Sequence, residues 1–335
     1  MLLLKNLPTF QSVALGGSAT CDLRLGDKVW MQILRISDNG TASADILTGR
    51  TGGANLTQDQ LEGIMDRIIR EIRVEINSKP QRRAKASQIN QINRLNGTRY
   101  QAFYSGTPGT PGFTIFLTIF WAEFWRKDLD QVPALALNLN PNSGTDVTTK
   151  LAFAGVDSAQ IKVELNDSVV VPADAGNGIT GGPPSVAAPD ISGFYAYTPY
   201  DSGHGVGAIN KWITTDLAAL GTKNDFKLDR VQFIQAIHLW PTQENAPKTV
   251  TYFRLEASGN DVHDRLSADD IAGYQYMMEL DPATNGRVDV VFDADDVVTN
   301  ALLAQTQTSL TMYLEYSGSA AGNLPVLIER IGELD

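Results

Sequence analysis

The chain has 335 residues, a formal net charge of −11 and 43% hydrophobic residues. This length exceeds one ordinary hydrophobic core and predicts two domains, and the composition is that of a globular protein, not a disordered one. The acidic balance disfavours direct binding to nucleic acid and a purely electrostatic attachment to anionic lipid. The single cysteine, Cys21, excludes an intrachain disulfide and CxxC metal chemistry.

Apolar runs in the chain are short. The N-terminus, MLLLKNLPTF, has too short an apolar run for a signal peptide. The longest apolar stretch, at 112–121, has about ten residues, whereas a membrane-spanning helix needs about 20. We therefore expect no spanning helix, and a chain that is made and kept soluble inside a cell until it is assembled.

In chain order, residues 1–37 are predicted to form two strands, and the Gly-, Thr- and Asn-rich residues 38–58 a surface loop. Residues 58–70 are predicted to form a short helix, with one apolar side made by Leu61, Ile64 and Ile68.

Residues 71–100 contain a strand, a turn and another short helix. The strand alternates in polarity with a period of two, as half-buried strands do, and its apolar residues are Ile72, Val74 and Ile76. A polar turn at 77–80 leads into a helical pattern that Asn96-Gly97 ends, with a stripe made by Ile89, Ile92 and Leu95.

A strand at 113–120 is apolar on both faces, which predicts cover on both sides. The aromatic residues that follow it are Trp121, Phe124 and Trp125. They are interpreted as core at the end of the strand, with a membrane-interface or partner-docking surface as the alternative. Strands are also predicted at 148–153 and 161–171, and residues 172–207 read as a long irregular connection.

The strand, turn and helix of 71–100 recur about 180 residues downstream. Residues 254–258 correspond to 73–77, and the helix at 266–280 starts with the capping-box-like pair Ser267 and Asp270. The flanking segments repeat in the same order, pairing 25–36 with 228–239, 113–120 with 287–292, and 148–153 with 310–316. This order predicts an internal duplication; chance resemblance among strands is the alternative.

Three histidines are the candidates for acid–base chemistry. His204 lies in the loop SGHGVG, which lacks the strand and the helix start of a phosphate-binding loop. His238 lies in a predicted strand, where a structural role is favoured over a catalytic one. His263 has acids on either side, and Asp264 is placed to orient it, but no Ser or Cys nucleophile stands in a recognisable elbow.

The acidic run Asp293, Asp295 and Asp296 offers the oxygen ligands that Ca²⁺ prefers. A solvated turn, or charge at a helix N-terminus, is the favoured alternative. We therefore assign no catalytic, cofactor-binding or metal-binding residue and no cofactor.

The order of the elements resembles the double jelly-roll major capsid proteins of icosahedral, membrane-containing bacteriophages, in particular the corticovirus type and the related lipid-containing Flavobacterium phage. The segments 231–240 (VQFIQAIHLW) and 250–270 (VTYFRLEASGNDVHDRLSADD) resemble the strand, strand and helix succession of that family's second barrel. The segment 69–80 (IREIRVEINSKP) resembles the corresponding part of its first barrel. The likeness covers most of the chain in pattern and little of it in identity.

The resemblance implies an all-β fold with short helices, built of two jelly-roll β-barrels in one chain (a double jelly roll). The expected division is a first jelly roll at 1–160, a long inter-barrel connection at 161–210 and a second jelly roll at 211–335. Three chains would form a homotrimer, a pseudo-hexameric tile of an icosahedral shell over an internal lipid membrane. The implied partners are neighbouring trimers, the minor capsid, penton and membrane proteins of the virion, and the internal lipid membrane, with no direct nucleic acid.

The same resemblance implies a structural coat protein without enzymatic activity, located in the virion after synthesis in the host cytoplasm. The alternative is a two-domain β-sandwich protein for carbohydrate binding or host attachment. That alternative rests on the aromatic and Gly-rich segment 194–207, in which Tyr197 and Tyr200 would stack on sugars. A hydrolase is a distant third, because the acids lack an evident paired arrangement.

Overall fold

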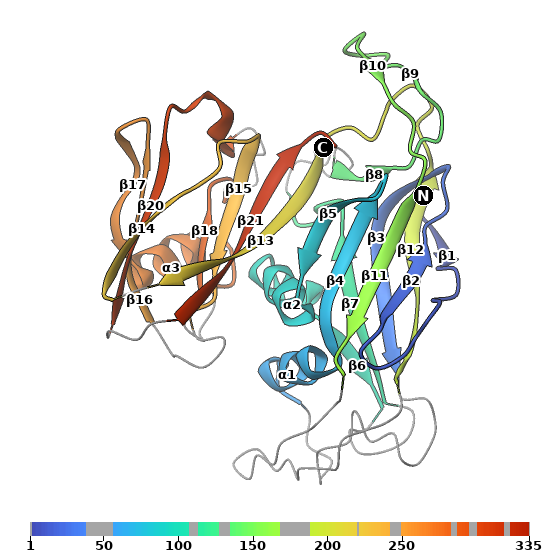
Figure 1. The fold of residues 1–335 in the computed structure, drawn as a ribbon, viewed down its shortest axis with the longest axis horizontal. Coiled ribbons are helices and arrows are strands. Elements are labelled where there is room, and N and C mark those ends of the chain that lie inside the picture. Colours follow the sequence, from blue (N-terminus) through green and yellow to red (C-terminus); the bar gives the residue numbers. More distant parts are fainter. Residues whose placement is uncertain are drawn as a thin grey trace.

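The structure is a computed structural model that describes residues 2–37, 56–106, 113–126, 135–167, 188–219, 221–241, 249–282, 287–294, 300–317 and 322–334. Its strands form two units that lie side by side, with the helix α2 (Ala86–Leu95) between them (Figure 1). Each unit consists of two facing antiparallel sheets with a hydrophobic core.

One sheet of the first unit has the strand order β1-β12-β3-β7-β6, and β8 pairs with β3. Its strands are β1 (Leu3–Asn6), β12 (Asp190–Pro199), β3 (Asp27–Ser37), β7 (Thr114–Phe120), β6 (Phe103–Ser105) and β8 (Leu137–Asn138). The facing sheet has the order β5-β4-β11-β2, with strands β5 (Lys79–Ala84), β4 (Ile69–Ile76), β11 (Ala159–Leu165) and β2 (Ser18–Asp22). A separate hairpin consists of β9 (Gly144–Thr145) and β10 (Ala152–Phe153).

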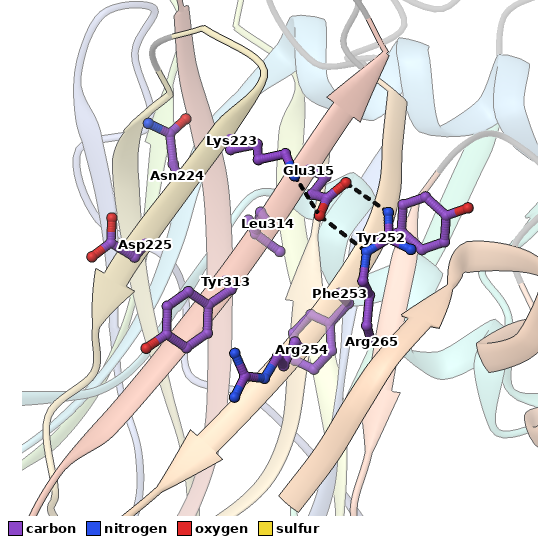
Figure 2. Close-up of a pocket in the computed structure, with 10 residues that line it drawn as sticks. All are labelled: Lys223, Asn224, Asp225, Tyr252, Phe253, Arg254, Arg265, Tyr313, Leu314 and Glu315. Carbon is purple, nitrogen blue, oxygen red and sulfur yellow. Dashed lines mark hydrogen bonds and ion pairs between the residues drawn. The ribbon is translucent and has the colours of Figure 1, made fainter. Parts of the chain in front are cut away.

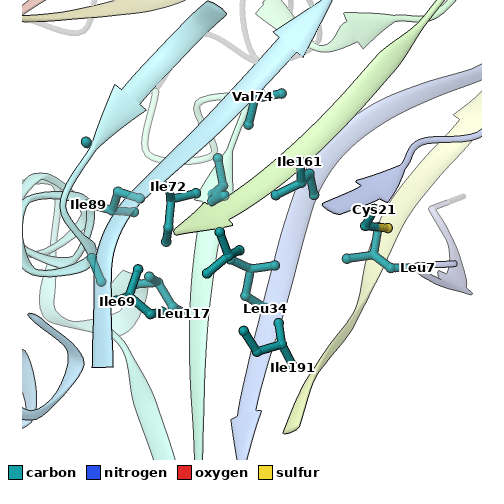
Figure 3. Close-up of a cluster of buried hydrophobic side chains, with 14 of the residues drawn as sticks. Leu7, Cys21, Leu34, Ile69, Ile72, Val74, Ile89, Leu117, Ile161 and Ile191 are labelled. Atoms are coloured by element: carbon teal, nitrogen blue, oxygen red, sulfur yellow. The ribbon is translucent and has the colours of Figure 1, made fainter. Parts of the chain in front are cut away.

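The core of the first unit lies between these sheets. Side chains of one sheet, such as Leu34 and Leu117, meet those of the other, such as Val74 and Ile161 (Figure 3). The helix α1 (Gln58–Ile68) packs beside α2, and both helices contribute to this core.

The second unit repeats this arrangement. One sheet has the order β13-β21-β15-β18, and β19 pairs with β15. The facing sheet has the order β14-β20-β16-β17. The strands are β13 (Ile209–Ala219), β21 (Gly322–Gly332), β15 (Phe233–Leu239), β18 (Val288–Val291), β19 (Leu302–Leu303), β14 (Lys223–Lys227), β20 (Leu310–Ser317), β16 (Thr249–Ala257) and β17 (Asn260–Ser267). The helix α3 (Ala268–Met277) follows β17, as α2 follows β5.

The strand orders of the two units correspond element by element in chain order. This correspondence supports the duplication that the sequence predicted, and it is the arrangement of two jelly rolls in one chain. One pairing was wrong, because the counterpart of β20 is β11 and not 148–153. Both β11 and β20 pair with the strand before a tight turn, whereas residues 147–149 form a turn.

Matching hairpin turns support the duplication. Asn77 and Ser78 join β4 to β5, and Ser258 and Gly259 join β16 to β17, with positive φ at all four residues. Two-residue turns of this kind suit the twist of an antiparallel hairpin. The sequence pattern predicted that each turn leads directly into a helix, so the strands β5 and β17 were not predicted. Neither strand has a continuous apolar alternation. The strand β17 lies at the edge of its sheet, and β5 lies at the edge of the first unit's sheet, where β13 of the second unit covers it.

The division at 161–210 also differs from the strand pairing. β11 pairs with β2 and β4, and β12 pairs with β1 and β3, so both lie within the first unit. Residues 166–189 separate these two strands, and 168–187 of them lie outside the described residues. The segment of β11 was predicted to belong to the connection between the units. Its partners β2 and β4 lie far from it in the sequence, so no local pattern indicated the pairing.

The two units join edge to edge. β13 pairs in parallel with β5 at Trp212 and Arg82, which links one sheet of each unit into a nine-stranded sheet. Within the described ranges, no helix has the length and apolarity needed to cross a membrane.

Candidate functional site

Charged and polar side chains are buried where the two units meet. Each is at most 7% exposed, and they are Arg82, Glu123, Arg126, Asn210, Gln235, His238, Asp289, Asp293 and Glu329. We call this set the inter-unit network. Buried groups of this kind require partners, because an unpaired charge in the interior is strongly destabilising.

His238 is at the centre of the second unit's share of the network. Its Nδ1 lies 2.7 Å from Asp289 Oδ1, and its Nε2 lies 2.7 Å from Glu329 Oε1. Burial lowers the pKa of His238, but the two carboxylates outweigh it and raise that pKa to about 9. The carboxylates, although buried, have lowered pKa values because of their positively charged partners, Arg287 and His238 for Asp289 and chiefly His238 for Glu329. The favoured state is therefore an imidazolium held between two carboxylates.

Arg82 fixes the contact between the sheet edges. Its guanidinium lies 4.0 Å from the ring centroid of Trp121 and 4.5 Å from that of Trp212. Its Nε donates to the carbonyl oxygen of Asn210 at 2.8 Å, and its Nη1 donates to the carbonyl oxygen of Phe120. One arginine thus connects the first unit to β13 by hydrogen bonds and by cation–π contacts.

Arg126 connects the two units at the other side of the network. It pairs with Glu123 of its own unit, and its Nη2 lies 2.6 Å from Asp293 Oδ2 of the second unit. Burial raises the pKa of Asp293 to about 7, against the lowering effect of Arg126. Asp293 is the ion-pair partner of Arg126; Asp295 and Asp296, the other acids of the candidate calcium run, lie outside the described residues. The residues that the structure describes contain no cluster of ligands suited to a metal ion.

The surroundings of His204 and Cys21 suit structural roles. His204 Nδ1 lies 2.8 Å from Asp146 Oδ2, and the side-chain amides of Asn138 and Asn140 donate to the His204 carbonyl oxygen at 3.0 and 2.8 Å. Burial raises the pKa of Cys21 to about 12, so its thiol is a poor nucleophile.

His263 lies among aromatic rings. Its ring centroid is 5.3 Å from that of Phe292 and 6.3 Å from that of Phe253. Burial lowers the pKa of His263. The structure records no hydrogen bond from His263 Nε2, so the expected orientation by Asp264 finds no support at that atom.

The aromatic residues of two segments also have definite places. Trp121 is fully buried, as the core interpretation predicted, while Phe124 and Trp125 are half-buried and pack against Phe120. Tyr195 is buried and donates through its hydroxyl to Asp27 Oδ2 at 2.6 Å. The ring of Tyr197 faces Lys5 Nζ at 4.3 Å. Because Lys5 already contacts the Tyr197 ring, the structure gives no support to stacking of a sugar on Tyr197.

A pocket of about 280 Å³ lies on the outward face of the second unit's sheet β14-β20-β16-β17 (Figure 2). At its centre Glu315 accepts hydrogen bonds from Arg265 at 2.9 and 3.0 Å and from Lys223 at 3.2 Å. Glu164 has the corresponding place on β11, where it accepts from Arg70 and Arg73. The two glutamates occupy corresponding places. The sequence pattern did not indicate this, because 310–316 was matched with 148–153 and not with β11.

The chain matches no model of a known protein family, and no curated protein matches it. Its fold is similar to solved structures over nearly its whole length. The major capsid protein P2 of bacteriophage PM2 is 14% identical with a TM-score of 0.68, over 99% of this chain and 97% of that chain. The PBCV-1 virus capsid protein is 10% identical with a TM-score of 0.61, over 99% and 93%. The major capsid protein of STIV is 11% identical with a TM-score of 0.58, over 99% and 96%.

These neighbours are double jelly-roll major capsid proteins, so the predicted resemblance and the predicted fold class are confirmed. At these identities the comparison concerns the fold.

Proposed function

We propose that this chain is the major capsid protein of a virus and that its role is structural. The observation that carries the proposal is the pair of jelly rolls, repeated strand for strand and joined edge to edge in one chain. The likeness to viral capsid proteins over 99% of the chain supports the same role.

The site geometry suits a structural role. The inter-unit network uses its acids, arginines and histidine as partners of one another, at 2.6 Å between Arg126 and Asp293 and at 2.7 Å in both pairs of His238. A buried ionic network contributes orientation more readily than net stability. Fixing the angle between two units is what a shell-forming tile requires.

The duplication supports a homotrimer. Two similar units related by about one sixth of a turn would, in three copies, close into a ring of six units with a true threefold axis. Such a pseudo-hexameric tile offers similar edges in six directions. The tile would contact neighbouring trimers in an icosahedral shell.

The proposal includes the setting that the sequence resemblance implied. The shell would enclose an internal lipid membrane in a bacteriophage virion, and the chain would be made in the host cytoplasm. Its further partners would be the minor capsid, penton and membrane proteins. The net charge of −11 fits a shell that does not bind the genome directly.

Electron microscopy of the purified protein tests this function. Class averages viewed along the particle axis are expected to show six density lobes arranged with threefold symmetry. The number of lobes distinguishes the trimer from the single chain, because a single chain has two units and would show two density lobes. Averages with two lobes, or rings of another symmetry, would contradict the proposal.

A further inference from the structure

We infer that the outward face of α3 docks onto the first unit of a second copy of this chain, as α2 docks onto the second unit within the chain. The inference rests on the proposed trimer and names the surfaces that close it. It follows from a comparison of the two helices.

The helices α2 and α3 occupy equivalent positions. Ile89 and Ile271, at the same point of each helix, are buried in the cores of their units. Asn93 donates through its side chain to the Thr118 carbonyl oxygen of β7. Gln275 donates in the same way to the Asp289 carbonyl oxygen of β18. Position by position, Leu95 of α2 therefore corresponds to Met277 of α3.

The outward face of α2 is covered by the second unit. Leu95 is 1% exposed and packs against Leu280 and Ala294. The Leu95 carbonyl oxygen accepts from the Asp281 amide at 2.8 Å, and Gln91 accepts from Trp240. The contacts of Gln91 and Leu95 with the second unit thus cover this face of the helix.

Among the residues that the structure describes, none covers the corresponding face of α3 in this way. Met277 is 80% exposed, Tyr276 is 76% exposed and Tyr274 is 48% exposed. Neighbouring apolar side chains with this exposure are typical of an interface. The duplication identifies the occupant, because the element that covers α2 has a counterpart in the first unit.

That counterpart is the outward face of the sheet β1-β12-β3-β7-β6 with the segment that follows α2. Leu34 and Ile36 of β3 point into the core, so Ile33 and Arg35 lie on the outward face. Apolar side chains are exposed on this part of the unit: Leu4 is 68% exposed, and Phe103, which stacks on Phe116, is 63% exposed.

The charges of the two surfaces are complementary. Glu279 is exposed and lies close to Met277 in the sequence. Arg99 is exposed next to Tyr100, whose ring packs against Phe120 at the end of β7. Opposite charges at the rim favour the register in which α3 of one copy meets the first unit of the next.

Oxidation of the wild-type protein by hydrogen peroxide tests the docking directly. Methionine reacts when its sulfur is accessible, and peptide mass spectrometry measures the sulfoxide at Met277. We expect oxidation of Met277 in the native assembly to be at least about tenfold slower than in the chain unfolded by guanidinium. Equal rates in the native and unfolded protein would overturn the inference.

Light scattering of Met277→Asp provides the second arm. We expect the wild type to be a trimer and the variant to be a folded monomer of 36.4 kDa, since the charge would lie in the contact. The matched control is Leu151→Asp, at a 66% exposed position of the β9–β10 hairpin, which should remain a trimer.

The outcomes separate the inference from the proposed function. A trimeric Met277→Asp variant would overturn the docking mode and leave the proposed function intact. A monomeric wild type would overturn both. Circular dichroism checks that the variant is folded, and a folded monomer is expected because Met277 is exposed in the single chain.

Discussion

Arg126 of the first unit and Asp293 of the second form an ion pair of 2.6 Å, and each side chain is 2% exposed. Arg126 also pairs with Glu123. A single guanidinium therefore pairs with two buried carboxylates from different units. The relative position of the units depends on contacts of this type.

The substitution Arg126→Met is expected to lower the free energy of unfolding by about 3–5 kcal/mol, because it leaves Glu123 and Asp293 buried without their cation. Urea denaturation measures the change. The control is Arg254→Met, since Arg254 pairs with Asp261 at the surface and exposed pairs contribute little. Similar losses in both variants would contradict the assigned role of burial.

His238 gives the protein a defined dependence of stability on pH. Its pKa in the folded chain is raised from 6.5 to about 9. The contribution of this histidine is therefore fully present below pH 6.5 and is lost as the pH rises through about 9. Thermal unfolding of the wild type and of His238→Gln between pH 6 and 9.5 should show that the difference between them shrinks with rising pH. A difference that stays constant would count against the charged histidine.

Val74 and Leu255 occupy equivalent positions in the cores of the two units, and both are at most 1% exposed. Either Val74→Asp or Leu255→Asp should cost about 4 kcal/mol or more, because each buries a charge without a partner. The measurement is the yield of soluble, folded protein. Val262→Asp, at a 38% exposed position of β17, is the control and should fold normally. Normal yields from the two core variants would show that the buried faces are wrongly assigned.

The turn between β16 and β17 requires a left-handed backbone, since Gly259 has a φ of 81°. We expect Gly259→Ala to destabilise the protein by about 1 kcal/mol. Gly63→Ala in α1 should instead stabilise it by about 0.5–1 kcal/mol, because a Cβ there meets nothing within 4 Å and the backbone is helical. Shifts of the thermal midpoint in the same direction for both variants would refute this reading.

Local patterns were sufficient to predict the elements with a marked apolar period. The stripe of Ile89, Ile92 and Leu95 corresponds to α2, and the alternation of Ile72, Val74 and Ile76 corresponds to β4. Edge strands were missed, because a strand with one neighbour need not alternate in polarity. The strand β17, with its sequence NDVHDRLS, illustrates this.

The inter-unit network was beyond local patterns for a different reason. Arg126 and Asp293 are 167 residues apart, and His238 and Glu329 are 91 residues apart. Only the folded chain brings these charges together. Of this network, local sequence could indicate one residue: the position of His238 within a predicted strand favoured a structural role for it.

Light scattering of the wild-type chain at micromolar concentration tests the central claim most directly. The account predicts a homotrimer of about 109 kDa, three times the chain mass of 36.4 kDa. A monomer of 36.4 kDa under these conditions would contradict it.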